Sequence, residues 1–141
     1  MEQQKSAVVN LPKQGLLFLI VGSLAALVHF LSLIMLVQIF HHEPVFANVL
    51  AFLIAFIFGF IGHLKFTFHA VKPQVSWKVS LTKWFVSSLF GFALNQSIFT
   101  AGIIFLGQQY YMLIWLIATG LVTICTFVLA KFWAFKGKYS S

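Results

Sequence analysis

Two segments of the sequence place basic side chains beside aromatic ones at the end of a long apolar run. Residues 60–68 read FIGHLKFTF, and residues 127–135 read FVLAKFWAF. In the first segment, the imidazole of His63 and the ammonium group of Lys65 could together hold an anionic headgroup. Lys131 supplies a cation in the second. Lysines here can also simply reach out of the hydrocarbon and fix topology, so the repeated aromatic context is what favours a binding role.

An aromatic residue follows each lysine, at Phe66 and at Trp133. Such residues anchor helices at the membrane interface, and they can also pack against a sugar ring or a prenyl chain. Polar residues also interrupt the apolar runs, at His29, Asn95 and Gln96. Because polar groups inside a membrane are costly, each is a candidate for contact with a polar substrate, with an interhelical hydrogen bond as the alternative.

No pattern typical of a catalytic or metal site is present. The sequence has no nucleophile beside a base, no paired carboxylates and no phosphate-binding glycine loop. His41, His42 and Glu43 are consecutive and point in different directions, which does not suit a metal. Cys125 is the only cysteine and is interpreted as a buried small hydrophobic residue. We predict that the protein is not an enzyme and uses no metal or cofactor.

The composition is that of an integral membrane protein. The 141 residues are 61% hydrophobic, 18% aromatic and 8% charged, and the mean hydropathy is +0.99. Such a chain has too little polar surface for a soluble domain. The net charge of +7 comes from nine lysines and two glutamates. Because the lysines lie at the ends of apolar segments, this charge predicts contact with membrane lipids and no binding of nucleic acid.

Four apolar runs are long enough to cross a bilayer core of about 30 Å. The expected spans are residues 15–39, 45–64, 84–106 and 111–130, with a connecting loop at 65–83. In this loop Pro73 could begin an interfacial helix, while the alternation at residues 75–81 also permits a short strand. The predicted fold is all-α, a polytopic membrane protein with four transmembrane helices in two hairpins.

Charge predicts the orientation of these spans. The N-terminal tail, the loop 65–83 and the C-terminal tail hold all nine lysines, and the two hairpin turns hold none. Because lysines are enriched on the cytoplasmic side, both termini are expected there. A cleaved signal peptide is the rival interpretation of the first run. That run is too long for one, and no convincing cleavage site follows it.

The two halves of the chain repeat. A constant offset of 67 residues aligns Phe18 with Phe85, His29 with Gln96 and Phe68 with Phe135. Because both hairpins keep the same topology, this predicts a parallel duplication with a pseudo-axis along the membrane normal.

Small residues at helical spacing mark the faces expected to meet. In the second run, Ala47, Ala51, Ala55, Gly59 and His63 follow one another every four residues, as in closely packed membrane helices. Comparable faces in the other runs carry Gly22, Ala25, Ala26, His29 and Ser32; Ser87, Gly91 and Asn95; and Thr119, Thr123 and Thr126. We expect a small, mildly polar interior, with leucine, isoleucine and phenylalanine facing lipid.

The two aromatic and basic segments, together with FLIVG at residues 18–22, resemble the GtrA-like family of small four-span bacterial membrane proteins over nearly the whole chain. The family pattern at the end of the second span is Asn, Arg, any residue, Trp, Thr, Phe. Here His63, Leu64 and Phe66 replace the Asn, Arg and Trp, whereas Thr67 and Phe68 match.

At the end of the fourth span, Lys131 stands where the family usually has arginine, whereas Trp133 and Phe135 match. Lysine supplies charge without the two-pronged geometry that arginine offers to phosphate. Lys65 could take over the role of the arginine that Leu64 replaces.

The resemblance implies a bacterial inner-membrane protein that handles a monosaccharide linked to a polyprenyl phosphate, such as undecaprenyl phosphate, for cell-surface polysaccharide glycosylation. The hypothesis is a flippase in which Lys65 and Lys131 recruit the phosphate while His63, Asn95 and Gln96 contact the headgroup.

One alternative is a non-transporting anchor or assembly subunit of a polyprenyl-phosphate glycosyltransferase, which would be a membrane partner. A third possibility is a small proton-coupled cation exporter. That type needs a carboxylate within a span, and both Glu2 and Glu43 lie outside the spans. A homo-oligomer could be needed to enclose a path through so small a bundle.

Overall fold

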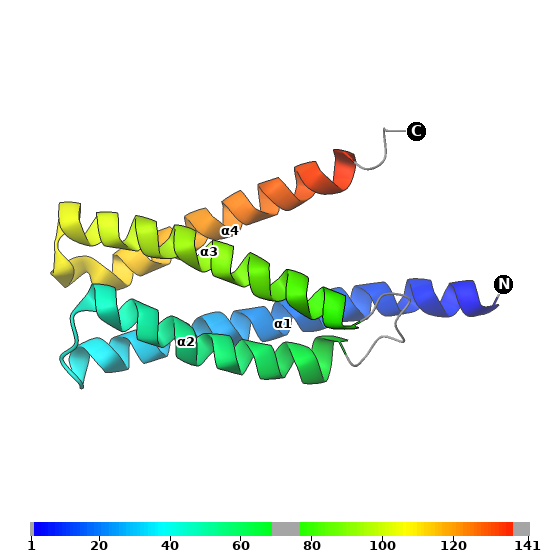
Figure 1. Ribbon diagram of the computed structural model, residues 1–141, viewed down its shortest axis with the longest axis horizontal. Helices are drawn as coiled ribbons and strands as arrows, with labels where there is room; N and C mark the ends of the chain where they lie inside the picture. Colours follow the sequence, from blue (N-terminus) through cyan, green and yellow to red (C-terminus); the bar gives the residue numbers. More distant parts are fainter. Residues whose placement is uncertain (1, 69–76, 137–141) are drawn as a thin grey trace. The chain divides into compact units, whose positions relative to one another are not determined.

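The computed structural model describes residues 2–68 and 77–136. Within these ranges, the side chains of residues 2–12, 14, 68, 77, 80, 127 and 129–136 lie outside the described part. The elements are α1 (Glu2–Gln38), α2 (Pro44–Gly62), the π-helix η1 (His63–Phe68), α3 (Trp77–Leu106), the 3₁₀ turn η2 (Gln108–Tyr110) and α4 (Tyr111–Lys136) (Figure 1). The described residues contain no strand, which confirms the all-α prediction.

Four of these helical segments are long and apolar enough to cross a membrane. They are Gly15–Gln38, Pro44–Thr67, Leu81–Leu106 and Gln108–Thr126. Each apolar run satisfies its backbone groups within its own helix, which is what a hydrocarbon environment demands of a single spanning segment. The predicted number and order of the spans are therefore confirmed.

The ends of the helices differ from the expected boundaries. α1 begins at Glu2 because residues 2–7 are mostly good helix formers, and the helix continues through Pro12. The expected loop 65–83 is helical at both ends, since η1 extends to Phe68 and α3 begins at Trp77. The strand alternative is wrong for residues 77–81, which are helical, and Pro73 lies outside the described residues.

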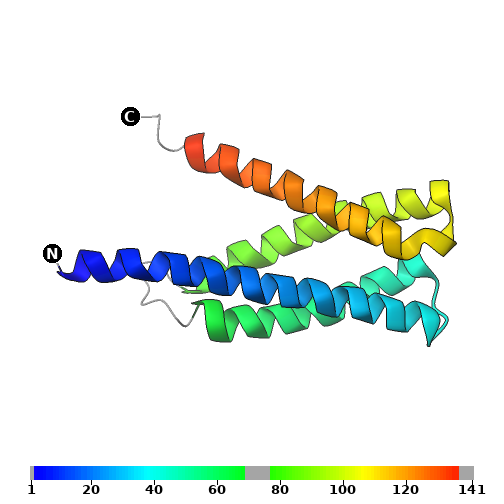
Figure 2. The ribbon, with the colours of Figure 1, turned by 180° about the vertical axis from the view of Figure 1, so that it is seen from behind.

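The chain divides into two compact units, Met1–Ser87 and Ser88–Ser141. The first unit, here called unit 1, contains α1, α2, η1 and the first turns of α3. α1 and α2 run side by side as an antiparallel hairpin, as the two opposite views show (Figures 1 and 2). His41 takes a left-handed conformation in the connecting turn, with a φ of 56°. Pro44 is the first residue of α2, a position where a backbone N–H would have no hydrogen-bond partner within the helix, so proline costs nothing there.

The four-residue ladder of α2 is buried in unit 1, as the sequence predicts. Ala47 and Ala51 are fully buried, and Ala55 and Gly59 are buried as well. A Cβ atom on Gly59 would lie 3.4 Å from the Cβ of Ala25 on α1, so the two backbones approach closely. The ladder continues beyond the predicted set to Thr67, which is buried too. Small residues thus set the contact between α1 and α2.

The second unit, unit 2, contains the rest of α3, η2 and α4. Gly107, with a φ of 96°, turns the chain between the two helices, a conformation that favours glycine. The buried side chains of this unit are largely bulky ones: Phe99, Ile103, Tyr111, Ile114, Trp115, with Ala118 beside them. Gly102 lies directly against Ile114, so a small residue on one helix receives a large one from the other.

The expectation of a small, mildly polar interior is therefore wrong for the size of the buried side chains of unit 2, although Asn95 is a buried polar residue there. Thr123 is exposed, and its hydroxyl bonds the backbone of its own helix. Ser87, at the edge of unit 1, is exposed as well. The spacing of small residues in the sequence does not predict these bulky buried side chains. On α3 and α4 a small residue packs against a large one, whereas the buried face of α2 consists of small residues.

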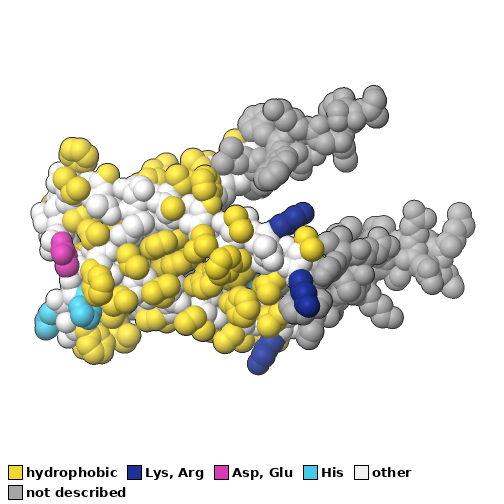
Figure 3. Space-filling model, in the orientation of Figure 1, with side chains coloured by type: hydrophobic (Ala, Val, Ile, Leu, Met, Phe, Trp, Pro, Cys, Tyr) yellow, Lys and Arg dark blue, Asp and Glu magenta, His cyan; other side chains and the backbone are white. Residues whose placement is uncertain are grey.

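Large apolar side chains cover the outside of the helices. Leu19, Ile57 and Phe105, for example, are 66%, 60% and 84% exposed. Figure 3 shows this apolar surface, with lysine side chains at one end of unit 1 and histidine and glutamate side chains at the other. An apolar band between polar ends is the surface that a protein presents to a bilayer.

Candidate functional site

The end of the second span is built on a π-helix. α2 ends at Gly62, and η1 continues the chain from His63 to Phe68. A π-helix closes i→i+5 hydrogen bonds in place of the α-helical pattern, and such segments are rare and often occur at functional sites. Three residues with predicted roles, His63, Lys65 and Phe66, lie on this one segment.

His63 is buried, with only 3% of its surface exposed. Its Nδ1 lies 3.1 Å from the Oγ1 of Thr67, which is buried as well. The ring of Phe18 on α1 lies 4.7 Å away and that of Trp84 on α3 lies 5.2 Å away, measured between ring centroids. One imidazole therefore meets side chains from three helical segments of unit 1.

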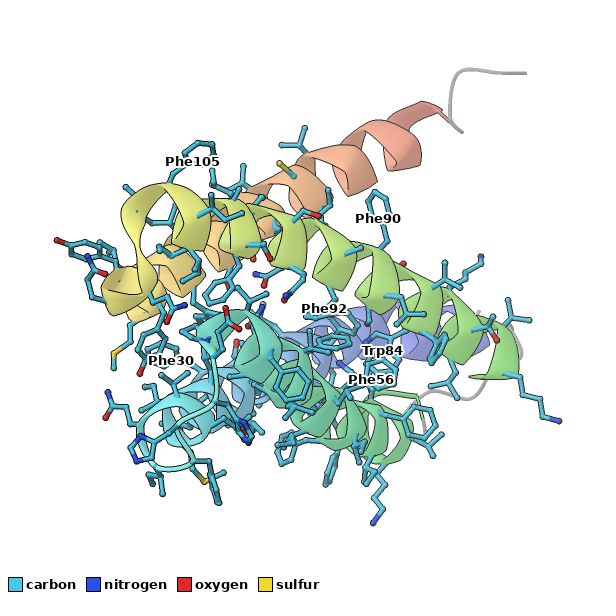
Figure 4. The ribbon with its side chains drawn as sticks, turned by 60° about the vertical axis from the view of Figure 1, so that its left-hand side comes forward. Phe30, Phe56, Trp84, Phe90, Phe92 and Phe105 are labelled. Atoms are coloured by element: carbon cyan, nitrogen blue, oxygen red, sulfur yellow. The ribbon has the colours of Figure 1, made fainter. Side chains whose placement is uncertain are left out.

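The imidazole belongs to an aromatic cluster in which Phe18 and Trp84 contact His63, and Phe56 and Phe60 contact Trp84. Trp84 stacks on Phe56, with ring centroids 5.2 Å apart and planes at 19°. Figure 4 shows these two side chains facing one another. Gly59 makes room for the indole, because a Cβ there would lie 3.7 Å from its Cζ2 atom. The cluster joins the start of α3 to the end of α2.

Lys65 and Phe66 take the opposite side of η1. Both side chains are exposed, Phe66 to 59%. The structure thus brings His63, Lys65 and Phe66 together within one turn, with the imidazole turned inward and the other two side chains outward. Lys65 and Phe66 are therefore at the surface of unit 1, whereas His63 and Thr67 are buried.

His29 lies deeper in the span and away from η1. It is eleven residues from Phe18 on α1, which corresponds to about 16 Å along the helix. Its Nε2 lies 2.9 Å from the Oδ1 of Asn48 on α2, and both residues are buried. The ring also packs edge-on against Phe52. His29 therefore makes the interhelical hydrogen bond that was the alternative to a substrate contact.

Unit 2 contains a comparable polar pair. Asn95 on α3 is buried, and its Nδ2 donates to the Oγ1 of Thr119 on α4 over 3.1 Å. Gln96, the residue that the 67-residue offset aligns with His29, is half-buried next to it. Each hairpin thus has a polar bond between its two helices.

The remaining predicted residues are Lys131 and Trp133. Both belong to α4, but their side chains lie outside the described residues. The backbone at this end of the second hairpin is α-helical, unlike the π-helical end of the first.

Thr67, Trp84 and Asn48 contact the predicted residues but were absent from the predicted set. Thr67 could have been found, because it lies four residues beyond His63 and extends the buried ladder. Trp84 could not, since its contact depends on how α3 packs against α2. Asn48 needed the relative placement of α1 and α2 to be paired with His29.

The described side chains include no group of three His, Cys, Asp or Glu residues that could hold a metal ion. Cys125, expected to be buried, is instead exposed on α4.

Comparison with known proteins shows to which family the chain belongs. No curated protein and no solved structure matches the chain. Residues 17–135 match the family described as "GtrA/DPMS, transmembrane domain". The match runs from the start of the first span to the aromatic end of α4. The chain therefore belongs to the GtrA/DPMS transmembrane domain family.

Proposed function

We propose that the protein moves a monosaccharide linked to a polyprenyl phosphate across the bacterial inner membrane. The family is associated with polysaccharide synthesis, which supports a substrate of this chemical class. The observation that carries the proposal is η1, which presents an exposed cation and an exposed aromatic ring on one side and a buried polar pair on the other, at the lysine-rich end of unit 1.

The chemistry of such a substrate fits these groups. A phosphate attached to lipid lies at the depth of the headgroups, where an interfacial ammonium group attracts it. Lys65 is exposed near the end of the second candidate span, Pro44–Thr67, and supplies the charge. Phe66, beside it, offers an apolar face to a sugar ring or to the first units of the prenyl chain.

The sugar requires polar partners once it leaves the headgroup region. A hydroxyl-rich group in hydrocarbon is stable only where hydrogen-bonding side chains replace water. His63 supplies such a group in unit 1, and Asn95 with Gln96 supply amides in unit 2. Lys131 is the counterpart of Lys65 in this proposal, as the second phosphate-attracting cation. The prenyl chain stays in the bilayer along the exposed apolar faces.

The test is transport by the purified protein. Proteoliposomes are loaded with a labelled polyprenyl-phosphate monosaccharide, and its movement between leaflets is followed. We expect the double variant Lys65→Ala/Lys131→Ala to lose at least about 90% of the initial rate, because the phosphate is no longer attracted.

The matched control is Lys78→Ala/Lys83→Ala, which removes the same charge from exposed sites on α3. This variant should transport at a rate within about twofold of wild type, since neither lysine lies on η1, where the phosphate-attracting cation of unit 1 is proposed to be. Equal activity in the two double variants would overturn the assigned lysine roles. Absence of transport by wild type would overturn the flippase proposal.

A second candidate is a non-transporting subunit that positions a glycosyltransferase. The family description supports it, because a transmembrane domain can serve as the membrane part of a larger assembly. In that case the chain would co-purify with a polyprenyl-phosphate glycosyltransferase and raise its activity, while proteoliposomes with the chain alone would show no movement of the lipid.

A further inference from the structure

Trp84 belongs to α3 but lies against the end of the second span. Its indole packs on the imidazole of His63, with ring centroids 5.2 Å apart, and stacks on Phe56 of α2 at the same distance. Phe60 lies 6.1 Å away. Figure 4 shows the indole and the ring of Phe56 facing one another. One side chain from the start of α3 therefore contacts both α2 and η1 within unit 1.

The indole lies on the buried side of η1. His63 and Thr67, which share a hydrogen bond of 3.1 Å, are only 3% and 1% exposed. Phe18 of α1 packs on the same imidazole, with ring centroids 4.7 Å apart. Rings from two other helices thus hold this side of η1 toward the interior of unit 1.

This packing bears on the direction of Lys65. Lys65 is two residues from both His63 and Thr67, and two residues along a helix correspond to about half a turn. With positions 63 and 67 held inward, position 65 is directed outward, and the side chain of Lys65 is exposed. Loss of contact on the buried side would free η1 to move, and the ammonium group would no longer have a fixed place.

The residues of η1 do not impose its conformation by themselves. Residues 60–68 and 127–135 are similar in sequence, yet α4 is α-helical where η1 is a π-helix. Such segments are rare, so this one needs support from its surroundings. The contact of Trp84 with His63, the first residue of η1, supplies part of that support.

We propose that Trp84 is a positioning residue for Lys65, which holds η1 in place by packing on His63 and so keeps the ammonium group directed outward. A group that is already fixed in its binding position loses less freedom when it binds a ligand, so the ligand is held more tightly. The effect on the lipid phosphate rests on the proposed function, whereas the hold of Trp84 on η1 does not.

The hold on η1 can be measured without transport. A nitroxide spin label on Lys65→Cys, in a background with Cys125→Ala, reports the mobility of η1 in lipid nanodiscs. We expect Trp84→Leu to shorten the rotational correlation time of the label at least about twofold, because η1 loses a tertiary contact. Trp84→Phe keeps one of the two fused rings and should give an intermediate value.

The matched control for this measurement is Phe85→Leu. Phe85 is the next residue of α3, and its ring packs on Phe56 with centroids 5.3 Å apart. This variant should leave the spectrum of the label unchanged. An unchanged spectrum in Trp84→Leu, or an equal change in Phe85→Leu, would overturn the proposal. If Trp84→Leu does not fold, wild-type mobility in Trp84→Phe overturns it instead.

Transport then tests whether Trp84 acts through Lys65. Trp84→Leu should raise KM for the labelled polyprenyl-phosphate monosaccharide roughly fivefold, the size of effect expected from one aromatic contact. The maximal rate should stay within about twofold of wild type, because the change weakens binding of the lipid and leaves later steps alone.

A second pair of variants separates positioning from a general loss of structure. In a Lys65→Ala background, where Lys131 remains, Trp84→Leu should cause no further rise in KM, because there is no ammonium group left to position. A further rise of the same size would overturn the role assigned to Trp84. Absence of transport by wild type would instead refute the proposed function, while the spin-label spectra would still test the hold on η1.

Discussion

The polar side chains inside the spans differ in what they contact. His29 with Asn48 and Asn95 with Thr119 each join two helices of one hairpin. His63 instead bonds a residue of its own segment, while aromatic rings from two other helices pack against it. At the scale of residues, the His29–Asn48 and Asn95–Thr119 pairs therefore hold helices together. His63 differs from them, because it lies on η1 two residues before the exposed Lys65.

The His29–Asn48 pair should show energetic coupling. We expect His29→Leu and Asn48→Leu each to lower the free energy of unfolding, and the double variant to lose less than the sum, by about 0.6–1.7 kcal/mol. The reason is that either single change already breaks the shared bond. Reversible unfolding in bicelles of the four proteins of the cycle gives the value.

The control cycle combines His29→Leu with Thr123→Val. The Thr123 hydroxyl bonds its own helix and is exposed, so these two changes should be additive. Additivity of His29→Leu with Asn48→Leu would contradict the bond between α1 and α2.

The sequence could identify these residues but not their partners. A polar residue in an apolar run is visible from composition alone, which is how His29, His63 and Asn95 were found. Whether each contacts another helix or its own segment depends on helix rotation and approach. Thr67 shows the difference, because the sequence marks it only by its spacing and its match to the family pattern, whereas the structure shows it buried and bonded to His63.

At the scale of elements, the packing of α1 against α2 depends on glycine and alanine. A Cβ on Gly62 would lie 2.8 Å from the Cγ1 of Val21, which is too close without movement. Gly62→Ala should therefore lower the free energy of unfolding by about 1–3 kcal/mol, partly offset by up to about 1 kcal/mol from the better helix propensity of alanine.

Val21→Ala in the same chain should restore most of this loss, since it removes the clashing methyl groups. Gly22→Ala is the matched control, because nothing lies within 4 Å of its added Cβ. It should be neutral or slightly stabilising. A Gly62→Ala protein as stable as wild type in thermal unfolding would show that α1 and α2 approach less closely than described.

The elements themselves were predictable where hydrophobic length decides them. Four apolar runs gave four spans, since a chain in hydrocarbon has to close its backbone bonds within each helix. The π-helical form of η1 was not predictable, because residues 60–68 and 127–135 look alike in sequence while only the first is π-helical. The interior of unit 2 was missed for a similar reason, as spacing does not reveal which small residue faces a large one.

At the scale of the whole molecule, the positions of charged residues predict the direction in which it crosses the membrane. The described lysines with placed side chains are Lys13, Lys65, Lys78 and Lys83. All four belong to unit 1, and Figure 3 shows lysine side chains at one end of this unit and histidine and acidic side chains at the other. We expect the lysine-rich end, and both termini with it, to lie in the cytoplasm.

Labelling of single cysteines checks this orientation. In a background with Cys125→Ala, a membrane-impermeant maleimide added to intact spheroplasts should react with His42→Cys in the α1–α2 turn. It should react with Lys78→Cys, near the start of α3, only after the membrane is permeabilised. The reverse pattern would place both termini outside and remove the basis for phosphate recruitment from the cytoplasmic leaflet.

The π-helix also bears on the symmetry that a tandem gene duplication would leave. An α-helix turns by about 100° and rises by about 1.5 Å per residue. A π-helix has more residues per turn, so each one advances the angle and the height by less. Beyond position 63, residues aligned by the 67-residue offset therefore differ in backbone angle and height. If Lys65 and Lys131 both attract a lipid phosphate, as proposed above, they do so from helix ends of unlike shape.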